Sequence, residues 1–589
     1  MKKVMTPEKM AKLAKVALGE EEADLVVLNA NLLDVYTGEL LPGYFVAVCE
    51  DRIAYVGQDA KHTVGTKSKV IDAGGKTLIP GLIDGHTHIV NQHYTVSEFL
   101  RYVMRGGTTT VVTELSEIAF PLGLQGLLEF LDAIENQPIK LFATIPPLVA
   151  CSPSQETVIS VEQLCELLKR DTLLGLGESY WLAAVRGDKR LFELYAKTLA
   201  SGKKLEGHSA GARDRKLAAY MAPGISSCHE PTTAEETLER LRQGVWVMVR
   251  EGVVRRDLEA ISKVKDLDLD LRYLALCTDG MSAGQLIEQG YMERLVQKAI
   301  NLGFKPSTAI QMATINVAQH FSLDDCLGGI APGKYADMVI IPDIRNIHAE
   351  YVISNGQVIA QDGELIVQPR KDTYSEFVTK SIHLPRELEA ADFAILASGK
   401  EQQATVRVIE MVTDLVTREK HITVPVSNGT LQWDKEAGIL KVAAIDRAHQ
   451  PGKMFVGFIA GFGLKRGALA ASDGWDTSDV VVVGADEVDM AQAVNRIKAL
   501  QGGLVVCADG EILAELALPV GGHISQKTME AIAQGQSHLR QAAQDLGCPF
   551  PNPFQAMKAL ASPAIPFLRI CHEGLADIRK GKIVDFMVD

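Results

Sequence analysis

Short apolar runs alternate with amphipathic helical patterns through the middle of the chain. In the helical patterns apolar positions recur about every three or four residues, whereas the runs between them are continuously apolar. This alternation is typical of repeated βα units around a parallel sheet. Eight candidate strands occur, which is the number that closes a TIM-type barrel. They lie at 82–88, 109–113, 140–145, 173–178, 204–208, 224–229, 245–249 and 273–279.

β-rich sequence with turn signals lies on both sides of this region. Strand-like runs precede it at 24–28, 44–48, 53–56 and 77–79. Others follow it at 337–341 and 351–359, where Asn355-Gly356 is a hairpin turn signal. We therefore expect one small composite β domain, built from residues 1–80 plus 330–380, with the barrel at 81–329 between its two halves.

The pattern changes again after Leu384-Pro385. Further strands are predicted at 404–412, 439–444, 454–458 and 480–483, and helices at 487–500 and 527–546. We expect a separate C-terminal α/β domain over residues 385–589. The predicted fold class is thus α/β: a (β/α)8 TIM-type barrel with a composite β domain and a C-terminal α/β domain.

Composition narrows the possible partners. The net charge of −14 and the lack of a Lys/Arg stripe argue against nucleic acid and favour a small-molecule substrate. No run of about 20 apolar residues occurs, so no membrane role is predicted. The nine cysteines are scattered without a Cys-x-x-Cys, and the first residues carry no apolar signal segment, so we expect a cytoplasmic protein. A homo-oligomer is left open.

The first barrel strand ends in a His-x-His, His86 and His88. Residues two apart on a strand project from the same face, so the pair can bind one metal ion; a polar strand face that happens to use imidazole is the alternative. Catalytic groups of such barrels lie at the C-terminal ends of the strands. Other residues suited to metal binding occupy those ends at the spacing of βα units of roughly 30 residues, namely Glu178, His208, His229 and Asp279.

Four imidazoles and two carboxylates suit two divalent ions of borderline character, Mn, Fe(II) or Zn. One ion would use His86, His88 and Asp279, a second would use His208 and His229, and Glu178 would bridge both. A water shared by two such ions has a pKa low enough to supply hydroxide near neutral pH. Asp279 would take up its proton and pass it to the leaving group. Asp279 and Glu178 are therefore the predicted catalytic residues, and the predicted reaction is hydrolysis at a polarised carbon.

The six ligand candidates and two longer segments, 79–88 and 329–339, together resemble the sequence pattern of the amidohydrolase superfamily. Within that superfamily the chain resembles the bacterial adenine deaminase family over nearly its whole length. That family uses a glutamate on strand four, where other members carry a modified lysine, and has an extra C-terminal domain. Matching stretches are Gly177-Glu178, Gly207-His208, 224–230, 277–279 and 565–569. The resemblance implies deamination of adenine to hypoxanthine and ammonia in purine salvage, with Mn or Fe(II).

The chain departs from the family pattern beside the site. It has Val90-Asn91 where the family has Glu-Ser, 114–117 where the family has Asp-Pro-His-Glu, Cys228 for an Asp before His229, and Gly280 for an Asp after Asp279. Within 114–117, Ser116 stands where the family has His. The C-terminal domain of the family carries a Ser-x-x-His-Asp-x-His-Asn motif, and here Trp475 and Ser478 replace its two histidines. The six proposed ligands are kept. These departures leave two alternatives: a hydrolase of another cyclic amidine or amide, or a catalytically silent paralogue that binds a ligand.

Other polar residues near these motifs are candidates to contact the substrate or the ligands. We expect four of them to be solvated loop residues instead, namely Glu117, Glu230, Asp476 and His523. His93 follows the His-x-His strand. The sequence is equally compatible with His93 lining the mouth of the barrel and with His93 lying on the surface.

Overall fold

Eight parallel strands form the centre of the molecule. The computed structural model describes residues 5–397, 399 and 401–588. Strands β6 to β10 make one sheet and β11 to β13 a second. The backbone N–H of Ser226 donates to Leu205, and that of Asp279 to His86, so the two sheets close on each other. The strands are β6 (Leu82–Thr87), β7 (Thr108–Thr113), β8 (Lys140–Ile145), β9 (Leu173–Tyr180), β10 (Lys204–His208), β11 (Ser227–Cys228), β12 (Trp246–Arg250) and β13 (Leu274–Cys277).

The barrel prediction is confirmed, although β6 is one residue shorter than expected and β11 and β13 are shorter still. β11 covers only two residues of 224–229, and Gly224 adopts a left-handed φ of 107° that an extended strand does not allow. β13 ends at Cys277, and Asp279 follows it with a φ of 54°. Such a φ is uncommon for a residue other than glycine, although Asp tolerates it better than most. The ligand candidates at these two ends therefore lie just beyond the strands.

Helices cover the outside of the barrel through apolar faces. Helix α11 shows the pattern, because Met292, Leu295, Val296 and Ala299 repeat at helical spacing and are buried together. The helices of this region are α2 (Val96–Val103), α3 (Ser116–Ile134, with a break at Gly123), α4 (Val161–Leu167), α5 (Trp181–Val185), α6 (Lys189–Ala200), α7 (Asp214–Met221), α8 (Ala234–Leu241), α9 (Leu258–Ile261), α10 (Ala283–Gln289), α11 (Met292–Asn301), α12 (Pro306–Met312) and α13 (Ile315–His320).

A nine-stranded sheet joins the two flanks of the barrel, as expected for a composite β domain. Its order is β17-β16-β15-β14-β5-β1-β2-β3, with β4 also paired to β1. The flanks meet where β14 runs antiparallel to β5, with Val339 opposite Ile79. The elements are α1 (Pro7–Leu18), β1 (Leu25–Leu33), β2 (Leu40–Cys49), β3 (Arg52–Gly57), β4 (Lys69–Asp72), β5 (Thr77–Pro80), β14 (Met338–Ile341), β15 (Tyr351–Ser354), β16 (Gln357–Gln361) and β17 (Glu364–Leu365).

The C-terminal part is a second nine-stranded sheet with helices, beside a three-stranded sheet. The main sheet contains β18 (Gln403–Met411), β19 (Thr417–Ser427), β20 (Thr430–Leu431), β21 (Ile439–Asp446), β22 (Met454–Ala460), β23 (Ala468–Ala471), β24 (Asp479–Gly484), β25 (Gly503–Ala508) and β26 (Glu511–Ala517). The other elements are α14 (Glu376–Thr379), α15 (Glu487–Leu500), α16 (Met529–Asp545), α17 (Pro553–Ala559), β27 (Leu568–Cys571), β28 (Gly574–Asp577) and β29 (Lys582–Val584). Strands β19, β20, β23 and β25 to β29 were not expected from the sequence. Among the described residues no helix is long and apolar enough to cross a membrane.

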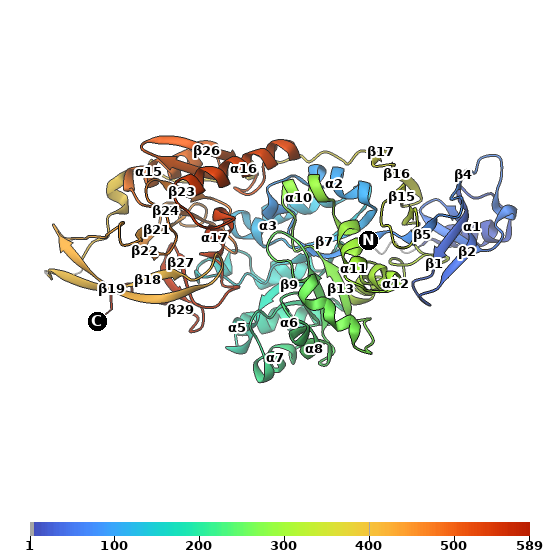
Figure 1. Cartoon of the computed structure of the whole chain (residues 1–589), viewed down its shortest axis with the longest axis horizontal. Helices are drawn as coiled ribbons and strands as arrows, with labels where there is room; N and C mark the ends of the chain where they lie inside the picture. Colours follow the sequence, from blue (N-terminus) through green and yellow to red (C-terminus); the bar gives the residue numbers. More distant parts are fainter. Residues whose placement is uncertain (1–4, 398, 400, 589) are drawn as a thin grey trace.

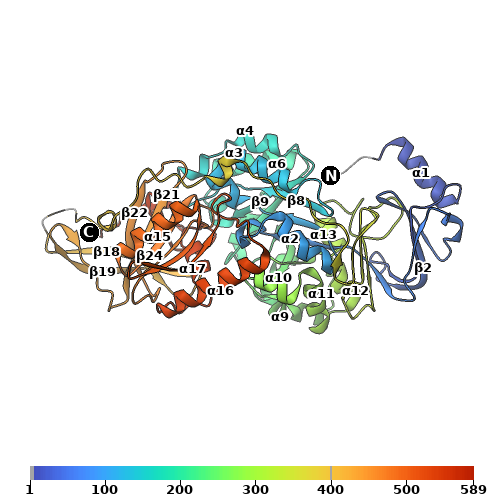
Figure 2. The same ribbon diagram turned by 90° about the horizontal axis from the view of Figure 1, so that it is seen from above.

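The three parts lie in a row, with the barrel between the N-terminal and C-terminal sheets (Figures 1 and 2). Helix α16 of the C-terminal part packs against α10 of the barrel. A buried charge cluster also crosses this boundary: Lys558 Nζ lies 2.7 Å from Asp473 Oδ2 and 2.9 Å from the Asn91 carbonyl oxygen. His93 Nε2 donates to the same Asp473 oxygen at 2.6 Å. The segment after β6 is thereby tied to the C-terminal domain.

Replacing Lys558 by Met should lower the free energy of unfolding by about 3–5 kcal/mol, because Asp473 would remain buried without its cation. Thermal and denaturant unfolding would measure this. Lys453→Met is the matched control, since Lys453 is 44% exposed and 3.5 Å from Glu573, and should cost under about 1 kcal/mol. Equal losses of stability in the two variants would contradict the idea that Lys558 joins the segment after β6 to the C-terminal domain.

Candidate metal centre and active site

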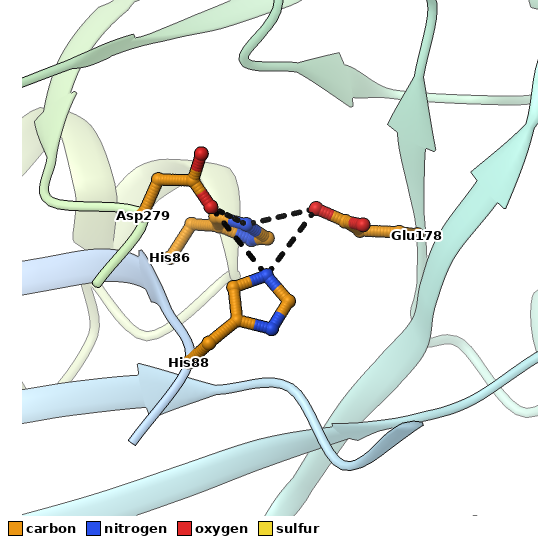
Figure 3. Close-up of side chains that lie close together, drawn as sticks. All are labelled: His86, His88, Glu178 and Asp279. Carbon is orange, nitrogen blue, oxygen red and sulfur yellow. Dashed lines mark ion pairs between the residues drawn. The ribbon is translucent and has the colours of Figure 1, made fainter. Parts of the chain in front are cut away.

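Four side chains converge at the C-terminal end of the barrel (Figure 3). His86 and His88 come from the end of β6, Glu178 from β9, and Asp279 from the turn after β13. His86 Nε2 lies 3.1 Å from Glu178 Oε1 and 3.6 Å from Asp279 Oδ1. His88 Nε2 lies 3.5 Å from each of the same two oxygens. All four groups thus direct one donor atom to a common point.

A second group shares Glu178. Glu178, His208 and His229 each place one donor atom within 4.8 Å of the others, and His229 Nε2 lies 2.8 Å from Glu178 Oε1. The structure therefore brings all six predicted ligand candidates together, in two sets that have Glu178 in common. Within the described residues, the buried atoms His86 Nε2 and His208 Nδ1 have no hydrogen-bond partner. A bound cation would satisfy such nitrogens, so the donor set fits divalent metal ions.

The charges of the cluster suit a cation. Burial raises the pKa of Glu178, but His229 and the other imidazoles outweigh burial and hold it well below its usual range. Burial also opposes ionisation of Asp279, yet His86 and Arg250 lower its pKa to about 2. Conversely, Asp279 and Glu178 outweigh the burial of His86 and raise its pKa to about 10. Both carboxylates are therefore ionised near neutral pH, and the protons of the imidazoles must leave when a metal binds.

Two residues that hold Asp279 and its strand in place were not expected from the sequence. Arg250 Nη1 donates to Asp279 Oδ2 at 3.3 Å, while its Nη2 donates to Asp257 at 3.2 Å. Asp84 accepts hydrogen bonds from the hydroxyls of Thr278 at 2.6 Å and Tyr291 at 2.5 Å. Asp84 precedes His86 and His88 at the same spacing of two within an apolar strand, and this spacing was the available signal.

The expectation that Glu117 and Glu230 are solvated is wrong. Glu117 is 2% exposed, and its Oε1 accepts from His88 Nδ1 at 2.6 Å. Glu230 is also buried; its Oε1 lies 2.7 Å from His229 Nε2, and its Oε2 accepts from the Ser209 backbone N–H at 2.6 Å. Glu117 contacts the ring nitrogen of His88 that is not directed at the donor cluster, so it orients that imidazole and raises its basicity. Glu230 instead faces the same His229 nitrogen that faces Glu178.

The same expectation is wrong for the C-terminal residues Asp476 and His523. Both are buried, because the C-terminal domain covers the open end of the barrel. Asp476 accepts from Tyr180 of β9, and His523 Nδ1 donates to the Gly521 carbonyl at 3.0 Å. His93 is buried as well, between Asp473 and Gln536, so a surface place for it is also excluded.

A cavity of about 290 Å³ lies between the metal-ligand cluster and the C-terminal domain. The barrel contributes His88, Glu178 and Asp279 to its walls, and the C-terminal domain contributes Leu415, Trp475, Asp476, Ser562 and Ile565. The volume is at the small end of the range for ligand sites. Of the positions that depart from the family pattern, Asn91, Ser116 and Trp475 line the cavity, whereas Val90, Cys228, Gly280 and Ser478 do not.

Comparisons with known proteins agree with this geometry. The amidohydrolase family pattern matches residues 77–366, and that of the adenine deaminase C-terminal domain matches residues 414–582. The curated adenine deaminase of Moorella thermoacetica is 37% identical over 98% of this chain and 97% of its own length. That of Paracoccus denitrificans is 37% identical over 99% of this chain and 98% of its own length. The chain belongs to the adenine deaminase family. The adenine deaminase of Clostridium botulinum (strain 657 / Type Ba4) is 36% identical over 98% of the chain and 97% of its own length.

Among solved structures, the L-hydantoinase of Arthrobacter aurescens aligns with 59% of this chain and 98% of its own, at 17% identity and a TM-score of 0.44. Membership of the amidohydrolase family and the His/Asp/Glu cluster of this chain together support dependence on divalent metal ions.

Glu178→Ala should reduce the bound metal to roughly one ion per chain or fewer, because the oxygen common to both donor sets is lost. Elemental analysis of protein purified without chelator would measure this. Glu166→Ala is the control, since that side chain is 70% exposed and should leave the metal content unchanged. Full metal content and full activity in Glu178→Ala would refute the assignment.

His523 should make the folded protein sensitive to acid. Burial, helped by Arg447, lowers its pKa from 6.5 to about 4, so between these pH values the unfolded chain binds a proton that the folded chain does not. This group should therefore remove about 2 kcal/mol of stability between pH 7 and pH 5. Unfolding of His523→Asn at both pH values should show a smaller loss than the wild type. The control is His538→Asn at an exposed position, which should lose as much stability between pH 7 and pH 5 as the wild type. If His523→Asn also loses as much as the wild type, His523 is not the source of the acid sensitivity.

Proposed function

We propose that this chain is a metal-dependent hydrolytic deaminase that converts adenine to hypoxanthine and ammonia. One observation supports this most strongly: two donor sets joined at Glu178 lie against a small cavity, in a chain similar over its whole length to adenine deaminases. The reaction adds water at the ring carbon that carries the amino group and releases that group as ammonia.

The six residues at the barrel end are the proposed metal ligands. His86, His88 and Asp279 would hold one ion, and His208 and His229 a second, with Glu178 between them. Mixed imidazole and carboxylate donors favour Mn, Fe(II) or Zn. When bound, such ions supply Lewis acidity, which makes water acidic enough to act as a nucleophile near neutral pH.

Asp279 is the proposed proton carrier. Its Oδ1 points into the cluster, while Arg250 holds Oδ2 and fixes the orientation of the carboxylate. Because the carboxylate is ionised, it can accept a proton from the attacking water and then deliver it to the amino group that leaves as ammonia. Glu117 keeps the His88 imidazole oriented meanwhile.

A hydrolase of another cyclic amidine or amide is the second candidate. The observation that favours it is the place of Asn91, Ser116 and Trp475, which depart from the family pattern and line the cavity. Kinetics across nucleobases, pterins and cyclic amides would separate the two. A catalytically silent paralogue is disfavoured, because a silent site does not need two complete donor sets. A metal content below one ion per chain would favour it.

We also propose a substrate class and a cellular role for the reaction. The substrate is a small purine base, and the reaction would serve purine salvage in the cytoplasm. The net charge of −14 supports a partner other than nucleic acid.

Metal-replete protein should release ammonia and hypoxanthine from adenine, and chelation should abolish this. Asp279→Asn should lower kcat by about 10²–10⁴-fold with metal still bound, because the proton acceptor is lost. Chromatography of the products and an ammonia assay would follow the reaction. Asp266→Asn, at a 67% exposed side chain, is the matched control and should retain wild-type kcat. No turnover of adenine by the metal-replete wild type would refute the proposed substrate.

A further inference from the structure

One carboxylate in the cavity wall differs from the others because it faces no cation in the described part of the chain. Six acidic side chains line the cavity: Glu117, Glu178, Glu230, Glu236, Asp279 and Asp476. Five of them face an imidazole or a guanidinium, including Glu236, which accepts from Arg213. Asp476 is the exception, because no cationic partner faces it among the described residues. It is also the ionisable residue that the C-terminal domain contributes to this wall.

The contacts of Asp476 leave one oxygen free for a ligand. Oδ2 accepts hydrogen bonds from the Tyr180 hydroxyl at 2.7 Å and from Ser562 Oγ at 2.6 Å. Both of these hydrogen bonds reach Oδ2 and none of the described residues donates to Oδ1, while the residue is 5% exposed and lines the cavity. Tyr180 follows Glu178 by two positions on β9, and both side chains line the cavity. The carboxyl group is thus fixed beside the metal-ligand strand.

The charge of Asp476 is also unusual. Its φ of 55° is a left-handed value that Asp tolerates better than most residues. Burial raises its pKa to about 7, against the opposing effect of Ser562 and Tyr180. Near neutral pH the free oxygen can therefore accept a hydrogen bond as a carboxylate or donate one as a carboxylic acid.

We propose that Asp476 determines substrate specificity, with its Oδ1 accepting a hydrogen bond from the imidazole-ring N–H of a free purine base. A purine substituted at N9, such as a nucleoside, has no N–H on that ring and cannot make this hydrogen bond. This inference rests on the proposed function, because it takes the ligand to be a purine. It assigns the C-terminal domain a direct part in substrate binding.

Product binding tests this assignment without requiring turnover. Calorimetry on the metal-replete protein would compare hypoxanthine with 9-methylhypoxanthine, which lacks the N–H. The wild type should prefer hypoxanthine by about 10–100-fold, the value of a hydrogen bond to a charged group. Asp476→Asn should lose most of this preference through weaker hypoxanthine binding, and its KM for adenine should rise more than its kcat falls. Its metal content should match that of the wild type.

A matched control is available in the same domain. Asp509 also has a φ of 55°, but its side chain is 73% exposed and pairs with Arg466 on the surface. Asp509→Asn should keep the wild-type preference. Asp476→Gly, in which glycine suits the positive φ, provides a second variant without the carboxylate if Asp476→Asn does not fold.

Several outcomes would overturn the proposal. These are an unchanged preference in a folded Asp476 variant, equal weakening of both ligands, loss of metal together with the preference, and no binding of either base by the wild type. Failure of the proposed function looks different. If the wild type binds hypoxanthine selectively through Asp476 but does not turn over adenine, the deaminase assignment fails and the specificity assignment stands.

Discussion

Closure of the barrel between its first and last strands is the constraint on which the site depends. The backbone N–H of Asp279 donates to the His86 carbonyl at 3.0 Å, and the buried Asp84 carboxylate accepts from the Thr278 hydroxyl. Asp84 and Thr278 are 194 positions apart in the chain, so a local segment could not form this contact. With both strand ends fixed, His86, His88 and Asp279 face Glu178 without further adjustment. The donor geometry is therefore a property of the closed barrel.

Much of this arrangement could be predicted from the sequence, because strand periodicity and strand ends carry the information. Continuous apolar runs located the eight barrel strands, and polar residues at their ends located the residues that converge around Glu178. Asp84 was missed because a lone carboxylate inside an apolar strand looks like an interruption of it. Arg250 was missed because a charge at the end of a strand is ordinarily solvated.

The C-terminal domain was harder to predict, and for a different reason. β23 consists of Ala and Leu only, which have little strand preference, and most of β19 is exposed, with four successive exposed residues and no alternation of buried and exposed positions there. The burial of Asp476 and His523 depends on how this domain docks onto the barrel, which no local pattern encodes. The same docking creates the cavity. Hydrolytic groups thus come from the barrel, while part of the shape of the cavity comes from another region of the chain.

The pairing of β5 with β14 also constrains how the protein can be made. β5 ends at Pro80 and β14 begins at Met338, so the whole barrel is synthesised between two strands that lie side by side in the finished sheet. During translation one edge of β5 stays unpaired until its partner leaves the ribosome. Exposed strand edges are templates for aggregation. The nascent N-terminal sheet therefore exposes this strand edge until the barrel has been synthesised.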